Sequence, residues 1–310
     1  MIALLLGYRV ITITRFFIMA GICLCTAVAM ANGKATEAKP GQNMQLAMAP
    51  AHIRQQSKPK IAIIIDDIGY NRKAGEKAIS LSGAFTYAVI PFTPFGSALA
   101  EQAYFSNKEV ILHLPMESSV RDILDKGGIT TSHSKYEVKQ AVRNSLNQLP
   151  YVVGFNNHMG SLLTTDQKAM SWIMEEVSGT SLFFIDSMTN PHSIAHETAN
   201  TYGIPSLRRD VFLDADPHPE HIEKAFKRLL RVAKRMGSAI AIAHPYPTTL
   251  EFLQARQKSF AGYGVELVSV SELVNGSQAA ITATQPEWDA QAIIDHLANL
   301  PSPESKHFNF

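Results

Sequence analysis

The chain has 310 residues, of which 46% are hydrophobic and 18% charged, with 18 Gly and 16 Pro. This composition is globular and excludes wholesale disorder, collagen-like repeats and a disulfide scaffold. Lys and Arg number 28 and Asp and Glu 27, so the formal net charge is only +1. Because no field of one sign is present to attract nucleic acid or acidic lipid, we expect neither as a partner.

The first 31 residues have the organisation of a secretory signal peptide. Two arginines precede an apolar stretch, residues 16–29, that contains both cysteines of the chain. Its length of about 14 residues is short for the roughly 20 residues of a membrane span. The stretch ends in a small-x-small sequence, residues 29–31, as a cleavage site requires. We expect secretion into the bacterial periplasm and no other membrane contact; an uncleaved N-terminal anchor is the alternative.

Composition along the rest of the chain predicts three further segments. Residues 32–59 are rich in Ala, Lys, Gln, Met and Pro without a sustained apolar period, which indicates a flexible linker. Residues 60–276 alternate short apolar runs with amphipathic stretches and form the predicted domain. Residues 277–310 are a tail with one short helical pattern, to which we assign no function.

The apolar runs of the domain predict buried parallel strands. Most are continuous rather than alternating, as expected for strands covered on both faces, and they lie at residues 61–65, 87–91, 110–114, 152–155, 182–185, 211–213, 240–243 and 265–270. Helical patterns separate them, including a capping box at Ser134 and Glu137, a second helix at 166–177, and a third at 219–236 that ends at Gly237.

This alternation predicts a (β/α) barrel. Strands recur roughly every 30 residues, which is the length of a βα unit. A doubly wound open sheet is the alternative, but no glycine-rich phosphate-binding motif follows the first strand.

Acidic and imidazole side chains follow almost every predicted strand. Chemistry in such folds lies at the carboxyl ends of the strands, where this sequence places Asp66, Asp67, His113, His158 and His244. Further side chains could support this site or replace a ligand: Glu117, Asn157, Asp186, Arg208 and Asp210. Aromatic side chains beside the same ends could stack on sugar rings or simply pack at the rim: Tyr70, Phe92, Phe95 and Tyr246.

The adjacent pair Asp66 and Asp67 indicates a metal site. Two neighbouring carboxylates repel one another, and a divalent cation bound to one of them relieves that cost. The alternative is an N-cap pair for the helix that begins near Asn71. His113 and His158 would supply the nitrogen ligands that suit Zn²⁺ or another first-row metal.

His244 is a candidate general acid, because an imidazole that is not a ligand titrates near neutrality. Asp186, Asp210 or Asp214 could hold its second nitrogen, and the sequence does not choose among them.

Seven blocks of the chain together resemble the divergent polysaccharide deacetylase family, a distant relative of the NodB-type carbohydrate esterases. In order they are IAIIIDDIGY, YAVIPFTPFG, EVILHLPMES, GFNNHMGS, FFIDSMTN, RRDVFLD and IAIAHP, and they cover residues 60–273. The resemblance implies a NodB-like barrel, usually of seven strands and often irregular or incomplete. It further implies that Asp66 is the catalytic base, that Asp67 and His113 bind metal, and that His244 is the late catalytic histidine.

Three positions depart from the NodB pattern. Glu117 stands where a second metal histidine is expected, residues 156–160 replace an arginine-proline motif, and Pro245 replaces an aspartate. We therefore expect His158 to be the third ligand, with Glu117 as its rival.

The expected function is a periplasmic, Zn²⁺-dependent deacetylase acting on N-acetyl or O-acetyl groups of a peptidoglycan-type or other glycan. One alternative is an inactive barrel that binds glycan or a cell-envelope partner. Another is a hydrolase of esters or phosphoesters, for which Arg208 and Arg209 are the only basic candidates at the strand ends.

Overall fold

The computed structural model describes residues 58–120 and 123–279. The expected signal peptide, almost all of the expected linker, and the tail beyond residue 279 lie outside the described residues. Within the described ranges, no helix is both long enough and apolar enough to cross a membrane.

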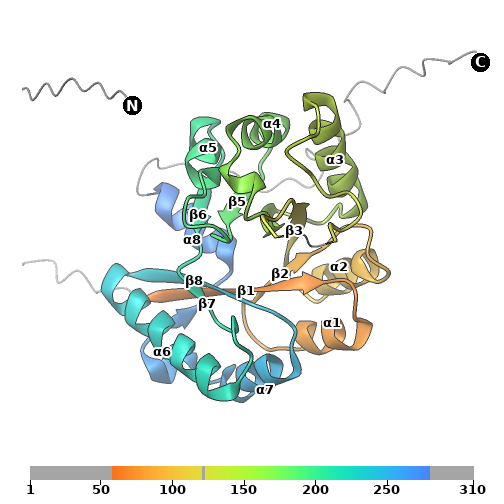
Figure 1. Cartoon of the computed structure of the whole chain (residues 1–310). Helices are drawn as coiled ribbons and strands as arrows, with labels where there is room; N and C mark the ends of the chain where they lie inside the picture. Colours follow the sequence, from red (N-terminus) through yellow and green to blue (C-terminus); the bar gives the residue numbers. More distant parts are fainter. Residues whose placement is uncertain (1–57, 121–122, 280–310) are drawn as a thin grey trace, which may run out of the picture. The chain divides into compact units, whose positions relative to one another are not determined.

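A single sheet of nine strands forms the centre of the domain (Figure 1). The strands are β1 (Lys60–Ile68), β2 (Thr86–Val89), β3 (Glu109–Met116), β4 (Gly154–Met159), β5 (Phe183–Asp186), β6 (Ser206–Arg208), β7 (Val211–Phe212), β8 (Ser238–Ala243) and β9 (Glu266–Leu267). Their order is β6-β5-β4-β3-β2-β1-β8-β7, with β9 paired to β1, and every pairing is parallel.

The sheet curls into a barrel that does not close. No pairing joins β6 to β7 within the described residues, although these strands are the two ends of the main strand order. The prediction of an irregular or incomplete (β/α) barrel is therefore confirmed, but eight strands rather than seven lie along its path. The additional strand, β6, has only three residues, one of them strongly apolar, and so left no apolar run in the sequence.

Eight α-helices accompany the strands in the described part of the chain. They are α1 (Arg72–Ile79), α2 (Gly96–Phe105), α3 (Lys135–Gln148), α4 (Gln167–Val177), α5 (Ala195–Thr201), α6 (Pro219–Met236), α7 (Pro247–Arg256) and α8 (Val270–Ala279). The predicted capping box begins α3, and Gly237 ends α6 with a φ of 89°. The run expected as a last strand is divided, because only Glu266–Leu267 is extended and Val270 begins α8.

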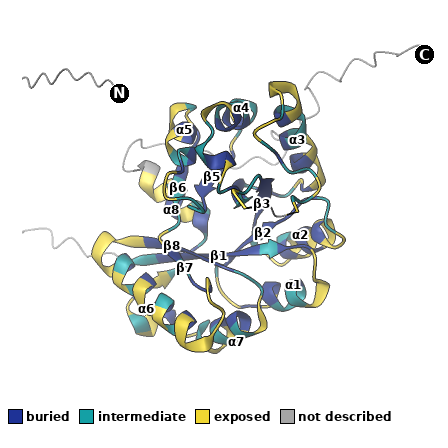
Figure 2. Ribbon diagram, viewed as in Figure 1, coloured by how far each residue is buried: buried dark blue, intermediate teal, exposed yellow. Residues whose placement is uncertain are grey.

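The two faces of the sheet pack against different helices. Alternate residues of β1, such as Ile63, share a large core with α1 to α7, which lie around the sheet in Figure 1. The intervening residues, such as Ile64, share a smaller core with Ile111 of β3 and with Leu273 of α8. Figure 2 shows that buried residues line the strands, while exposed residues lie mainly on the outer faces of the helices. Helix α8 therefore fills the inside of the open barrel.

Shortening a side chain of this inner core should destabilise the protein. Ile111 is fully buried, so Ile111→Ala should lower the free energy of unfolding by about 2–5 kcal/mol, because methylene groups are lost and a cavity remains. Chemical denaturation measures the change. The matched control is Ile123→Ala, because Ile123 is 96% exposed and its truncation should change stability by less than about 0.5 kcal/mol. If both substitutions lowered the free energy of unfolding equally, the assignment of Ile111 to a buried inner core would be contradicted.

Candidate active site and metal centre

The polar side chains of the site continue the inner face of the sheet. Asp66 follows the inward-facing Ile64 by two residues, and His113 follows Ile111 by two, so both point to the inner face. His113 is also the direct register partner of Asn156 on β4. The inside of the barrel is thus apolar near α8 and polar at the carboxyl ends of the strands.

Asp67 reaches the same space only because the backbone of β1 is irregular. Adjacent strand residues normally point to opposite faces. Here the register of β1 against β2 shifts between Ile65 and Ile68, and Asp67 has a φ of 58°, which few non-glycine residues adopt. As a result, both carboxylates approach Nε2 of His113, at 3.5 Å from Asp66 and 3.2 Å from Asp67.

Asp67, His113 and His158 converge on one point. Asp67 Oδ1 lies 3.2 Å from His113 Nε2 and 3.0 Å from His158 Nδ1, and the two nitrogens are 3.1 Å apart. Ligands about 2.1 Å from a tetrahedral Zn²⁺ would be separated by roughly 3.4 Å. Asp67 Oδ1 is buried and makes no hydrogen bond, although both imidazoles are near it. The three residues therefore fit a divalent metal. Among the described residues, they form the one group of side chains whose arrangement could hold a metal ion.

Asn156 links the candidate metal site to the neighbouring carboxylate. Its Nδ2 donates to Asp66 Oδ1 at 2.9 Å, and its Oδ1 lies 2.7 Å from Nδ1 of His113. A carboxylate accepts hydrogen bonds, so the amide nitrogen must face Asp66 and the amide oxygen must face His113. The proton of His113 then lies on Nδ1, and the lone pair of Nε2 is directed toward the centre. One amide thus fixes both a ligand tautomer and the orientation of Asp66.

Asp214 holds His244 beside the centre. Its Oδ1 lies 2.9 Å from His244 Nδ1, and its Oδ2 accepts from the backbone N–H of His244 and from the Thr249 hydroxyl. Nε2 of His244 lies 3.9 Å from Asp67 Oδ2. Burial alone lowers the pKa of His244, but the hydrogen bond and charge of Asp214 outweigh it and raise the pKa to about 9. Of the three aspartates the sequence offered, the structure selects Asp214.

The buried charges of the site shift one another's pKa values. Burial is the largest influence on Asp66 and raises its pKa, although His113 and His244 partly offset this. Burial also acts to raise the pKa of Asp67, but its contacts with His113 and His158 prevail and lower it. The pKa of His113 is raised overall, because Asp66 and Asp67 outweigh its burial. The carboxylates and imidazoles of this group therefore favour one another's charged forms, and a bound cation would likewise favour the ionised carboxylates.

Two other predicted residues form local structural contacts. Glu117, the rival ligand, accepts from the backbone N–H and the hydroxyl of Thr131 through Oε2 and does not join the convergent group. Asn157 accepts from the backbone N–H of Ser187 and donates to the carbonyl of Met159. Asn157 therefore joins the loops that follow β4 and β5.

The remaining predicted residues also bond elsewhere. Asp186 accepts from the backbone N–H of Met188 and from the Ser193 hydroxyl. Asp210 accepts from the backbone N–H of Ile240, and Arg208 pairs with a glutamate of α5. Asn71, rather than either aspartate of the pair, caps α1.

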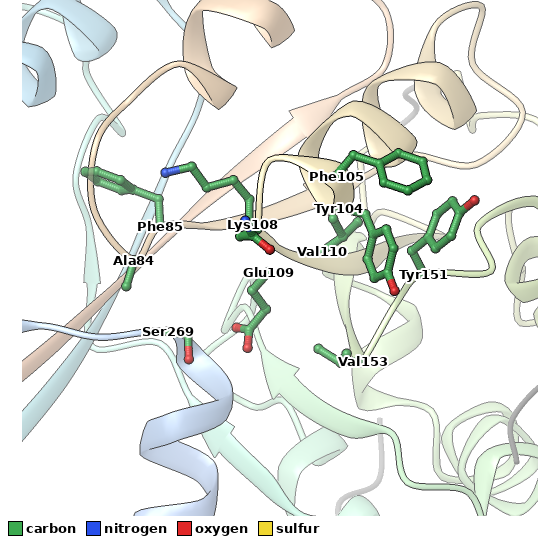
Figure 3. Close-up of a pocket in the computed structure, with 11 residues that line it drawn as sticks. Ala84, Phe85, Tyr104, Phe105, Lys108, Glu109, Val110, Tyr151, Val153 and Ser269 are labelled. Carbon is green, nitrogen blue, oxygen red and sulfur yellow. The ribbon is translucent and has the colours of Figure 1, made fainter. Parts of the chain in front are cut away.

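A separate hollow of about 660 Å³ lies at the opposite, amino ends of β2 and β3 (Figure 3). Figure 3 shows Glu109 beside Ser269 on one side, with Tyr104 and Tyr151 on the other. Oε1 of Glu109 accepts from the Thr86 hydroxyl and from two backbone N–H groups at the start of α8. The carboxylate of this hollow therefore anchors the helix, and no group of metal-binding side chains lies there among the described residues.

Comparison with known proteins agrees with the expected resemblance. The sequence profile described as divergent polysaccharide deacetylase matches residues 63–274. The chain is 35% identical over 228 residues to the uncharacterized protein YibQ of Escherichia coli K12, covering 74% of this chain and 71% of YibQ. It is 32% identical over 217 residues to an uncharacterized protein of Haemophilus influenzae, covering 70% of this chain and 77% of the relative.

Solved structures support the fold alone. An uncharacterized protein of Agrobacterium tumefaciens C58 superposes with a TM-score of 0.67 at 20% identity, covering 70% of this chain and 89% of the other. A protein of Enterococcus faecalis V583, titled a putative cellobiose-phosphate cleavage protein, gives a TM-score of 0.51 at 15% identity, covering 70% of this chain and 99% of the other.

Metal binding should depend on His158 and not on Glu117. After loading with Zn²⁺ and removal of excess metal, elemental analysis should find nearly one equivalent in the wild type. His158→Ala should lose that metal because one of the three converging ligand atoms is gone. Glu117→Ala is the matched control and should retain it, since its carboxylate bonds to Thr131. Retention by His158→Ala together with loss by Glu117→Ala would move the third ligand to Glu117.

Proposed function

Because the chain belongs to the divergent polysaccharide deacetylase family, we propose that it is a metal-dependent hydrolase that removes N-acetyl or O-acetyl groups from a glycan. The observation that carries this proposal is the convergence of three ligand side chains with a buried carboxylate and an aspartate-held imidazole. A pure binding protein needs no such pair of proton-transfer groups beside a metal site.

Asp67, His113 and His158 would hold the metal in this proposal, with Zn²⁺ the cation that best suits the donor set. When bound, the cation would lower the pKa of a water molecule and polarise the acetyl carbonyl. A backbone N–H of the turn that follows Asp66, near Gly69, would help to stabilise the negative charge on the carbonyl oxygen.

Asp66 would act as the general base. Its Oδ1 is held by Asn156, so Oδ2 is the oxygen that can accept the proton of the attacking water. Burial raises the pKa of Asp66, which brings the carboxylate closer to the working pH and makes it a stronger base. The same burial would exclude bulk water from the proton that is being transferred.

His244 would act as the general acid. Its Nδ1 is bonded to Asp214, so Nε2 is the nitrogen that carries the proton toward the centre. A pKa of about 9 keeps the imidazole protonated at neutral pH, ready to protonate the leaving amine or alcohol. The ring of Tyr246 stacks beside His244, is 42% exposed, and could pack against a sugar ring.

We also propose that the protein acts in the bacterial periplasm on a peptidoglycan-type or other envelope glycan. This rests on the signal-like residues 1–31 and on the family's name.

Replacing the base should separate metal binding from turnover. Asp66→Asn keeps the size of the side chain but cannot accept the proton, so acetate release from acetylated chitooligosaccharides or peptidoglycan fragments should fall by about 10²–10⁴-fold. Metal content should remain near that of the wild type. Undiminished turnover in Asp66→Asn would exclude the base assignment. A metal-loaded wild type that releases no acetate from any acetylated glycan would favour a glycan-binding barrel.

The pH dependence should report the Asp214–His244 pair. An acid must be protonated to act, so kcat/KM should fall as the pH rises through the pKa of His244. Asp214→Asn removes the charge that raises this pKa and should move the basic limb of the profile to lower pH. Asp210→Asn is the matched control, because Asp210 bonds to the backbone of Ile240 instead. An unchanged basic limb in Asp214→Asn would contradict the role of His244.

A further inference from the structure

A carboxylate on the loop between β3 and α3 contacts the metal ligand His158. Asp125 Oδ2 lies 3.0 Å from Nε2 of His158, the ring nitrogen opposite the one that faces Asp67 and His113. Both side chains are mostly buried, with 16% of His158 and 15% of Asp125 exposed. The two ring nitrogens of His158 therefore face two different carboxylates.

This arrangement selects the protonation state that a metal ligand needs. Nδ1 of His158 can coordinate a cation only when it carries a lone pair, so the ring proton must lie on Nε2. An ionised carboxylate has no proton to donate, so Asp125 acts as a hydrogen-bond acceptor and favours a proton on Nε2 of His158. A carboxylate behind a ligating imidazole also orients the ring and strengthens its nitrogen as a donor.

The second oxygen of Asp125 is held by the turn that follows β1. The hydroxyl of Tyr70 donates to Asp125 Oδ1. The loop itself is anchored close by, because Ile129 is fully buried and exchanges backbone hydrogen bonds with Pro115 and Glu117. Asp125 is therefore fixed from both sides, which distinguishes it from a carboxylate on an exposed loop.

We propose that Asp125, held by Tyr70, is the positioning residue of the metal centre, fixing the ring and tautomer of His158 so that Nδ1 binds the cation. This inference rests on the metal site of the proposed function. It adds to the three proposed ligands a fourth side chain, which contacts a ligand and not the cation. It assigns a function to a loop residue that no sequence pattern had indicated.

The test is a metal titration of the whole protein with Co²⁺ and Zn²⁺, using the Co²⁺ absorption bands and competition with a chelator. Asp125→Ala should weaken metal affinity by about 10–100-fold. Asp125→Asn should weaken it less, because the amide oxygen still accepts from Nε2–H but carries no charge. Tyr70→Phe should have the smallest effect, since the contact between Asp125 and His158 remains.

The matched control is Asp216→Asn. Asp216 also pairs with a histidine, Oδ2 to His221 Nδ1 at 2.6 Å, but both side chains are 57% exposed and neither belongs to the ligand group. This variant should bind metal as the wild type does. Thermal unfolding of every variant separates a loss of fold from a loss of affinity. In the Zn²⁺ form, ¹H–¹⁵N correlation of the imidazoles should place the proton of His158 on Nε2.

Each outcome separates this inference from the proposed function. Normal affinity in folded Asp125→Ala and Asp125→Asn would overturn the positioning role and leave the metal site intact. A His158 proton on Nδ1 in the Zn²⁺ form would also overturn it, and would remove Nδ1 of His158 from the proposed ligands. If the Asp125 variants bind metal more weakly but the metal-loaded wild type releases no acetate, the positioning role is supported and the deacetylase activity is contradicted. A wild type that binds neither Co²⁺ nor Zn²⁺ would overturn both.

Discussion

The distortion of β1 at Asp67 is the constraint on which the site depends. In a regular strand Asp66 and Asp67 would point to opposite faces, and the outer face is filled by the helices. The register shift and the left-handed φ of Asp67 turn the second carboxylate toward the space occupied by the first. Such a backbone conformation costs on the order of 1–3 kcal/mol and persists only where the surrounding structure enforces it. Here the rigid, fully buried run of β1 and the imidazoles of His113 and His158 provide that enforcement.

The two adjacent aspartates are chemically alike but have different environments. Asp66 is 2% exposed and bonded to an amide, and burial raises its pKa; Asp67 faces two imidazoles, which lower its pKa. Groups of one type whose pKa values are pushed apart are typical of acid–base sites. Asn156 maintains the difference, because it gives Asp66 a neutral donor and holds Nδ1 of His113, which leaves Nε2 of that ring facing the centre beside Asp67.

The features that could be predicted from the sequence are those that depend on a local residue pattern, such as buried strands and the side chains at their ends. Buried parallel strands are continuous apolar runs, so seven of the nine strands were found close to their true positions, while the three-residue β6 left no run and β9 retained only two residues of its expected length. The side chains that converge at the candidate site could be predicted because each follows such a run. Asn156 and Asp214 were not singled out, because their importance comes from the register of β3 with β4 and from one choice among three aspartates. Asp125 lies in a segment without any periodicity, and only its contact in space identifies it.

Glu117, which stands where the NodB pattern has a second histidine, has a structural role of its own in this chain. Glu117 does not simply leave a ligand position empty, because its carboxylate bonds to Thr131 and its backbone N–H to the carbonyl of Ile129. The backbone hydrogen bond, which an alanine at this position would keep, holds the end of the same loop that presents Asp125 to His158. The side chain at the position where the NodB pattern has a ligand therefore bonds locally, while the loop that follows it brings Asp125 to His158 on the neighbouring strand. In the proposed metal centre, β4 therefore supplies an imidazole and the loop after β3 supplies its carboxylate partner.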